Sequence, residues 1–213
     1  DLGPDPDHRY VAINLNNLAV LYYKQGQYAQ GELVIKRALA IREKTLGPDH
    51  PHVASSLNDL AMLYLSRGQY AQAEPPFKRA LAIREKTLGP DHPNVATSLQ
   101  NLATLYNAQG RYAKAEPLYK RALAITERAL GSDHPNVAGG LNNLAALYYS
   151  QGQYAQAEPF IKRALAIDEK ALGPDHAKLA RTLENYAALL RKTNRANEAE
   201  EMEVRAKRIQ ARH

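Results

Sequence analysis

Apolar residues recur along the chain at intervals of three and four positions, which is the spacing of side chains on one face of an α-helix. Between residues 51 and 67 the pattern comprises Val53, Leu57, Leu60, Ala61 and Tyr64. A second set spans residues 70–87, and the turn sequence Leu88-Gly89-Pro90 follows it. No segment alternates apolar and polar residues with period two. The pattern therefore predicts two helices joined by short connections, and no β-strand.

The ends of these helices carry the expected signals. The first helix is preceded by Asp49-His50-Pro51, a polar capping sequence with proline in the first turn. It is followed by Gly68, which tolerates the left-handed conformation common after a helix. Proline falls in the second turn of the second helix, at Pro75, Pro117 and Pro159. Because the apolar period continues beyond these prolines, we predict a bend there rather than a break.

The helix pair is one copy of a unit that repeats every 42 residues. Gly26, Gly68, Gly110 and Gly152 are spaced by this period. The sequence KRALAIREKTLGPDHP occurs twice, at residues 36–51 and 78–93. We predict five copies, at about residues 9–50, 51–92, 93–134, 135–176 and 177–213. The last copy diverges, with Asn194 in place of glycine.

The residues that carry the period resemble the tetratricopeptide repeat. The matching positions are Leu60-Ala61, Tyr64, Gly68, Tyr70, Ala73, Phe77 and Ala80. The usual tetratricopeptide repeat has 34 residues, and the longer unit here resembles the 42-residue form of kinesin light chains. The resemblance implies an all-α fold, a right-handed α-solenoid of five antiparallel helical hairpins, with residues 1–213 forming a single repeat domain. It also implies a non-enzymatic protein-interaction scaffold.

Composition restricts the function further. The 213 residues are 45% hydrophobic and 23% charged, with a net charge of +6 and no cysteine. Disulfides and thiolate metal sites are therefore excluded. No apolar run has the length of about 20 residues that a membrane span needs, and the chain begins with Asp1 and shows no signal peptide. We interpret the chain as a fragment of a longer, cytoplasmic protein without a membrane partner.

We find no catalytic or cofactor-binding motif, and we expect no enzyme activity, no cofactor and no metal. The one recurring chemical feature is an Asp-His pair in each unit. These pairs are Asp7-His8, Asp49-His50, Asp91-His92, Asp133-His134 and Asp175-His176. We interpret them as capping and linker elements. A metal site is the alternative, but packed helices are separated by about 8–10 Å, too far for two Zn–N bonds of about 2.0–2.1 Å to bridge.

A candidate binding surface appears once the core positions of the first helix of each unit are set aside. At about 100° per residue, the opposite face carries a column of amides and two additional tyrosines. We predict that this inner, concave face binds an extended peptide, because an amide offers hydrogen-bond donors and an acceptor to a peptide backbone. The predicted peptide-binding residues are Asn16, Asn17, Tyr23, Asn58, Asn101, Asn107, Asn142, Asn143, Tyr149 and Asn185.

Similar asparagines on the inner face of kinesin light chains receive short cargo-adaptor peptides, which implies the same role for Asn17, Asn101, Asn143 and Asn185. Asp59 interrupts the amide column and would repel an acidic ligand. As an alternative, the asparagines bridge to the neighbouring hairpin instead of contacting a ligand.

Two other functions remain open. The near-identical units, and a first hairpin in which Tyr10 and Val11 lack a preceding neighbour, are compatible with end-to-end self-association, although we expect a monomer. The excess of Lys and Arg is compatible with nucleic-acid binding. We do not expect nucleic acid as the partner, because glutamates lie close to the basic pairs and no base-stacking pattern repeats from unit to unit.

Overall fold

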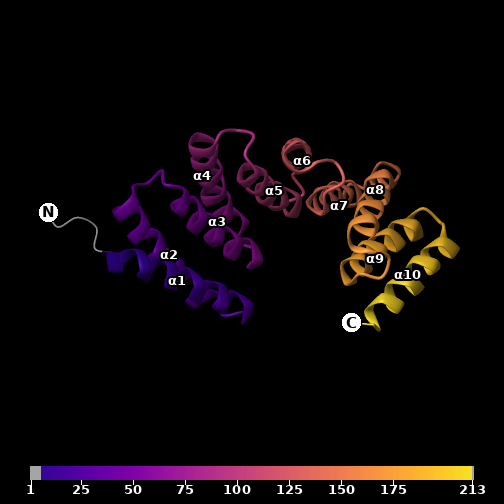
Figure 1. The fold of residues 1–213 in the computed structure, drawn as a ribbon, viewed down its shortest axis with the longest axis horizontal. Helices are drawn as coiled ribbons and strands as arrows, with labels where there is room; N and C mark the ends of the chain where they lie inside the picture. Colours follow the sequence, from indigo (N-terminus) through magenta and orange to yellow (C-terminus); the bar gives the residue numbers. More distant parts are fainter. Residues whose placement is uncertain (1–5, 213) are drawn as a thin grey trace. The chain divides into compact units, whose positions relative to one another are not determined.

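A computed structural model of the chain describes the backbone of residues 6–212 and the side chains from Tyr10 to Arg212. Ten α-helices and no strands occur in this range (Figure 1). The helices are α1 (Pro6–Lys24), α2 (Tyr28–Leu46), α3 (Pro51–Ser66), α4 (Tyr70–Leu88), α5 (Pro93–Ala108), α6 (Tyr112–Leu130), α7 (Pro135–Ser150), α8 (Tyr154–Leu172), α9 (Ala177–Lys192) and α10 (Ala196–Gln210). The predicted all-α fold of repeated helix pairs is therefore confirmed.

The helices belong to two compact units, Asp1–Leu105 (unit 1) and Tyr106–His213 (unit 2), and the boundary lies within α5. In unit 1, α1 pairs with α2 and α3 with α4, while α2 also packs on α3. In unit 2, α7 pairs with α8 and α9 with α10, while α6 packs on α7 and α8 on α9. The second helices α2 and α8 thus each contact both their own partner and the first helix of the next pair. The single repeat domain and its handedness remain predictions.

The buried clusters of the two units use equivalent positions and differ at one of them, where Val53 corresponds to Leu179. In unit 1 one buried cluster consists of Val53, Ala54, Leu57, Ala80 and Ile83, with Leu39 of the preceding helix packed against it. The corresponding cluster of unit 2, three repeats later, contains Leu179, Ala180, Leu183, Ala206 and Ile209, with Leu165 packed against it. Because a side chain from the preceding repeat completes each cluster, one hairpin alone cannot bury its apolar face.

Histidine and aspartate have separate roles in the Asp-His pairs. His50 is the N-cap of α3, and its Nδ1 accepts a hydrogen bond from the backbone N–H of His52 (3.1 Å). Equivalent bonds form at His92, His134 and His176. Asp49 forms an ion pair with Lys86 of α4 (2.5 Å). His50 therefore caps α3, and Asp49 links the loop between α2 and α3 to α4. These contacts confirm the interpretation of the Asp-His pairs as capping and linker elements. The side chains of Asp7-His8 lie outside the described residues.

The predicted helix ends and prolines are also observed. Gly68 follows α3 with φ of 70°, in the left-handed region that favours glycine. In the last repeat Asn194 occupies the equivalent position with φ of 60°, which asparagine tolerates better than most residues. The second helices continue unbroken through Pro75, Pro117 and Pro159, as the apolar period predicted.

The first helix is more exposed than its counterpart in the next repeat. Tyr10 and Val11 are 68% and 38% exposed, as predicted, whereas Val53, at the position equivalent to Val11, is fully buried. The difference arises because Val53 packs against the preceding second helix, which contributes Leu39.

Candidate functional site

Several amide side chains of the inner face form hydrogen bonds that link the first helices of consecutive repeats within a unit. In unit 1, Nδ2 of Asn16 donates to Oδ2 of Asp59 (2.8 Å), and Nδ2 of Asn101 donates to Oδ1 of Asn58 (2.7 Å). In unit 2, Nδ2 of Asn142 donates to Oγ1 of Thr182 (3.2 Å). The bridging alternative therefore describes four of the predicted residues. A peptide contact at these positions remains a prediction, and it would have to share the amides with the bridge.

The other predicted amides differ in accessibility. Asn17 and Asn185 are exposed, whereas Asn107 and Asn143 are half-buried. The Oδ1 atoms of Asn107 and Asn142 are buried, and no described group donates a hydrogen bond to either. Asn17, Asn143 and Asn185 are therefore the amides best placed to bond a ligand.

Tyr23 and Tyr149 occupy equivalent positions at the ends of α1 and α7. The ring of Tyr23 lies edge-on to Tyr28 with centroids 5.7 Å apart, and that of Tyr149 lies edge-on to Tyr154 at 5.3 Å. The hydroxyl of Tyr23 also shares a hydrogen bond with Oγ of Ser66 (2.8 Å). Each ring is thus fixed by the start of its own second helix, which leaves one ring face as a wall of the inner surface.

A cavity of about 200 Å³ lies on this surface of unit 2 and brings together three predicted residues. It is lined by Asn142, Ala145, Ala146, Tyr149, Ser150, Ile161, Asn185 and Ala188. Ile161 belongs to α8 and was missed, because the prediction considered only the first helix of each repeat. The apolar spacing of α8 could have indicated it. The cavity therefore has an apolar floor with amides at its rim.

Unit 1 has a cavity at the same place in its repeats, with a volume of about 100 Å³. Ala19, Val20, Tyr23, Ile35, Asp59 and Leu63 line it. Five of these residues correspond, three repeats on, to lining residues of the unit 2 cavity. Val20 occupies the position of Ala146, and Asp59 that of Asn185. Because Val20 is bulkier than Ala146, this replacement is consistent with the smaller volume of the unit 1 cavity.

Asp59 also changes the charge of the unit 1 cavity. Burial raises the pKa of Asp59, while hydrogen bonds from Asn58 and Asn16 and the charges of Arg42 and Arg84 lower it. Asn185 at the equivalent position is neutral at every pH. The unit 2 cavity is therefore both larger and free of a carboxylate on this wall.

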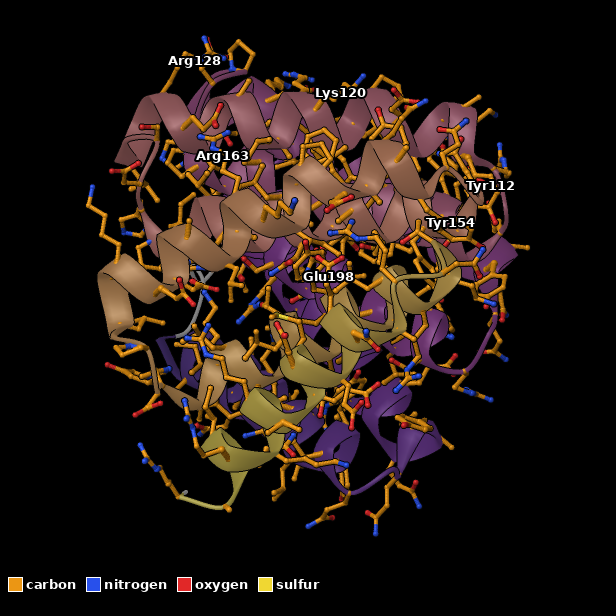
Figure 2. All side chains as sticks on the ribbon, turned by 90° about the vertical axis from the view of Figure 1, so that its right-hand side faces the viewer. Tyr112, Lys120, Arg128, Tyr154, Arg163 and Glu198 are labelled. Atoms are coloured by element: carbon orange, nitrogen blue, oxygen red, sulfur yellow. The ribbon has the colours of Figure 1, made fainter. Side chains whose placement is uncertain are left out.

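The basic pairs on the second helices are largely neutralised. Each lysine forms an ion pair with a glutamate four residues earlier in the same helix. Arg79 pairs with Glu43, and Arg163 pairs with Glu127. Figure 2 labels Lys120, Arg128 and Arg163 among the side chains on the second helices of unit 2. This pairing weakens the field that a nucleic-acid interface would need.

Two further features concern metals and membranes. Within the described part of the chain, no three His, Asp or Glu side chains gather as a metal site would require. None of the described helices combines the length and apolar character of a membrane-spanning segment.

Comparisons with known proteins agree with this architecture. The chain matches the Tetratricopeptide repeat family over residues 10–86 and 136–212, and the Nephrocystin-3 TPR domain over residues 65–171. Among proteins with curated functional descriptions, none matches the chain significantly.

Solved structures also match. A candidate kinesin light chain of Podosopora anserina with nearly identical TPR-like repeats is 29% identical, with a TM-score of 0.78, covering 93% of this chain and 94% of that one. BtubC (BKLC) of P. vanneervenii is 30% identical, with a TM-score of 0.83, covering 96% and 81%. Pseudomonas aeruginosa pilF, at 18% identity and a TM-score of 0.67, shares the fold alone and covers 95% and 78%. The 42-residue period, the repeated hairpins and these matches establish that the chain belongs to the tetratricopeptide repeat family, in its kinesin-light-chain-like form.

Proposed function

We propose that this chain is a protein-interaction scaffold that binds an extended peptide on the inner face of its first helices, with the unit 2 cavity as the anchor site. One apolar side chain of the peptide enters the cavity against Ala145, Ala146 and Ile161. The amide of Asn185 bonds the peptide backbone beside it, and the ring of Tyr149 forms one wall. Catalysis has no part in this function.

The observation that carries the proposal is the convergence of Asn142, Tyr149 and Asn185 on one cavity with an apolar floor. A cavity of about 200 Å³ is smaller than the roughly 300–1,000 Å³ typical of small-molecule sites, which favours a single side chain as its occupant. Tetratricopeptide repeats generally serve as protein-interaction scaffolds, and the concave surfaces of helical repeats are commonly their binding surfaces.

The experiment selects nine-residue random peptides on the immobilised chain and measures the dissociation constants of the selected peptides by fluorescence anisotropy. We expect the peptides to share one apolar residue at a fixed position. Ala188→Met places in unit 2 the residue that unit 1 carries as Met62. Because it fills the cavity, we expect it to weaken binding at least about tenfold, which corresponds to about 1.4 kcal/mol.

The matched control is Ala166→Met, the same change at an exposed position of α8 that does not line the cavity. It should leave the dissociation constant unchanged. Equal affinities for wild type and Ala188→Met would show that the anchor lies elsewhere. Asn185→Ala tests the backbone contact separately and should weaken all selected peptides to a similar extent, because a backbone contact does not depend on the side chains.

A further inference from the structure

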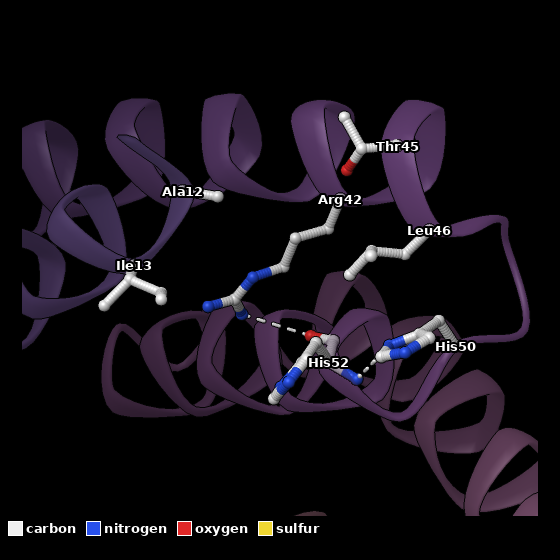
Figure 3. A pocket seen from close by; sticks show the side chains of 7 residues that line it. All are labelled: Ala12, Ile13, Arg42, Thr45, Leu46, His50 and His52. Atoms are coloured by element: carbon white, nitrogen blue, oxygen red, sulfur yellow. Dashed lines mark hydrogen bonds between the residues drawn. The ribbon is translucent and has the colours of Figure 1, made fainter. Parts of the chain in front are cut away.

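A second cavity of unit 1 lies away from the inner-face amides, where α2 ends and α3 begins. Its volume is about 290 Å³. Ala12 and Ile13 of α1 form one side, Arg42 and Leu46 of α2 the other, and His52 lies near the start of α3 (Figure 3). Neither the amide column nor the unit 2 cavity contributes to it.

Arg42 is a buried cation at the centre of this cavity. Its residue is only 8% exposed, and Figure 3 shows the guanidinium between the α1 wall and His52. Nη1 donates to the carbonyl oxygen of His52 (3.1 Å) and to Oγ of Ser56 (2.6 Å). Among the described residues, none accepts a hydrogen bond from Nε or Nη2 of Arg42. The described partners of this cation are therefore neutral, and we call the Nε–Nη2 side of its guanidinium, which has no acceptor among the described residues, its open edge.

The charge of Arg42 is only partly compensated. Burial lowers its pKa, and the carboxylate of Asp59 acts in the opposite direction. A chain of hydrogen bonds links Arg42 to Asp59. Arg42 donates to Ser56, Ser56 donates to Oδ1 of Asn16 (3.2 Å), and Asn16 donates to Asp59 (2.8 Å). Asp59 also interacts with Arg84 of the next repeat. The buried Arg42 and the half-buried Arg84 thus share one carboxylate, which leaves a net positive charge that favours an anion.

The open edge of Arg42 has the geometry of a carboxylate fork. Nε and Nη2 lie on the same edge of a guanidinium and can bond the two oxygens of one carboxylate. Elsewhere in this chain Arg191 makes that contact, with Nε and Nη2 at 2.8 and 2.9 Å from the two carboxylate oxygens of Glu203. At Arg42 the same pair of donors is directed at the cavity instead of a protein carboxylate.

The remaining walls are suited to a short hydrocarbon group. Ala12, Ile13 and Leu46 supply aliphatic surface. The hydroxyl of Thr45 donates to the backbone carbonyl of Ile41 (2.8 Å), so its proton is already used. A ligand with an anionic head and an aliphatic tail satisfies both the cation and these walls, whereas a bare inorganic anion would leave the apolar walls without contact.

We propose that this cavity binds a small aliphatic carboxylate, whose oxygens accept hydrogen bonds from Nε and Nη2 of Arg42 and whose hydrocarbon chain packs against Ala12, Ile13 and Leu46. This site is independent of the proposed peptide anchor in unit 2, so either one can fail without the other.

The experiment is a titration of the isotope-labelled chain with sodium butyrate, followed by ¹H–¹⁵N NMR at the backbone amide of His52 and the side-chain Nε–H of Arg42. We expect saturable shifts with a dissociation constant of about 1–10 mM. Butyramide, the neutral analogue, should bind at least about tenfold more weakly, because it lacks the charge. Inorganic phosphate should also bind more weakly, because it lacks the hydrocarbon tail.

Arg42→Gln should abolish the saturable shift of the His52 amide. The matched control is Arg84→Gln, because Arg84 makes the equivalent bonds to the carbonyl oxygen of Asn94 (3.3 Å) and to Oγ of Ser98 (2.7 Å). It should weaken butyrate binding much less than Arg42→Gln does, because it removes one of the two charges that share Asp59 but none of the donors at the cavity. Ile13→Ser introduces the residue that the next repeat carries as Ser55, and it should weaken butyrate more than phosphate without removing the arginine.

Three results would overturn the proposal. They are the absence of saturable shifts in the wild type, equal binding of butyrate and butyramide, and unchanged binding by a folded Arg42→Gln variant. If that variant does not fold, as judged by circular dichroism, Ile13→Ser decides the question. Equal weakening of butyrate and phosphate would then refute the predicted hydrocarbon contact.

Discussion

In unit 1 the second helix α2 reaches the first helix α3 with a cation, whereas in unit 2 the second helix α8 reaches α9 with an anion. Arg42 contacts a backbone carbonyl ten residues later, at His52. At the equivalent position in unit 2, Oδ1 of Asp168 accepts a hydrogen bond from Nζ of Lys178, also ten residues later (2.8 Å). Both contacts join the end of a second helix to the start of the next first helix.

The comparison shows that a charged group of either sign can link the two helices at this junction. Asp168 is fully buried, whereas Lys178 remains 33% exposed. Arg42 is 8% exposed and uses neutral acceptors. In unit 2, Lys178 closes the junction by pairing with one oxygen of Asp168, although the other oxygen, Oδ2, is buried without a hydrogen-bond partner. In unit 1, Nε and Nη2 of Arg42 have no acceptor among the described residues.

The largest expected effect comes from breaking the closed junction. Lys178→Met leaves the buried carboxylate of Asp168 without its cation, and we expect the free energy of unfolding to fall by about 3–5 kcal/mol. Urea denaturation followed by circular dichroism measures the change. Lys170→Met is the control, because Lys170 and Asp133 are an exposed pair, for which about 0–1 kcal/mol is expected. Similar losses in the two variants would contradict this account.

A second experiment transfers the unit 2 junction into unit 1. Arg42→Asp should destabilise the chain, because the new carboxylate faces the carbonyl of His52 and no cation. Adding His52→Lys recreates the Asp-Lys arrangement at the same ten-residue separation. We expect a favourable coupling energy of about 1–3 kcal/mol from the double-mutant cycle, measured by urea denaturation. A coupling energy near zero would mean that the new Asp and Lys side chains do not meet, and therefore that the backbone at residues 42 and 52 differs from that at residues 168 and 178.

The smallest effect concerns a contact that both units share. Glu158 accepts hydrogen bonds from Lys162, Arg195 and Tyr186. These contacts lower the pKa of Glu158 to about 2, and Lys162 has the largest effect. Because the folded pKa lies below the ordinary 4.5, the contact stabilises the fold fully above about pH 4.5 and is lost as the pH falls towards 2. Glu158→Gln should lower the free energy of unfolding by about 1 kcal/mol near neutral pH.

Thermal unfolding between pH 2 and 7 tests this dependence. The difference in Tm between wild type and Glu158→Gln should be about 2–4 °C above pH 5 and should close towards pH 2. Glu32 has the same surroundings in unit 1, where Lys36, Tyr64 and Arg67 lower its pKa, so Glu32→Gln should give a similar profile. A constant difference at all pH values would rule out the carboxylate as its cause.

The fold was predictable from the sequence because it depends on residues that recur in every repeat. The 42-residue period fixed the number of repeats, and the Gly and His-Pro signals fixed the helix ends to within one or two residues, as α3 and α4 illustrate. The inner-face position of Tyr149 and Asn185 also followed from helical spacing alone.

What the sequence did not reveal depends on contacts between repeats. Helical spacing places Asn16 and Asn101 on the inner face, but only the neighbouring helix determines that their amides bond to Asp59 and Asn58. Residues 42, 84, 126 and 168 are Arg, Arg, Thr and Asp, so a search for recurring residues passes over this position. Ile161 was missed because it reaches the cavity from the second helix.

The separation of bonded residues along the chain has a consequence for how this protein is made. The bonds that link consecutive first helices join residues 40 or 43 positions apart, as at Asn142 and Thr182 or Asn16 and Asp59. Such short loops close quickly, and proteins dominated by local contacts fold in microseconds to milliseconds. A ribosome adds about 5–20 residues per second, so each hairpin can dock on its predecessor before the following one has been synthesised.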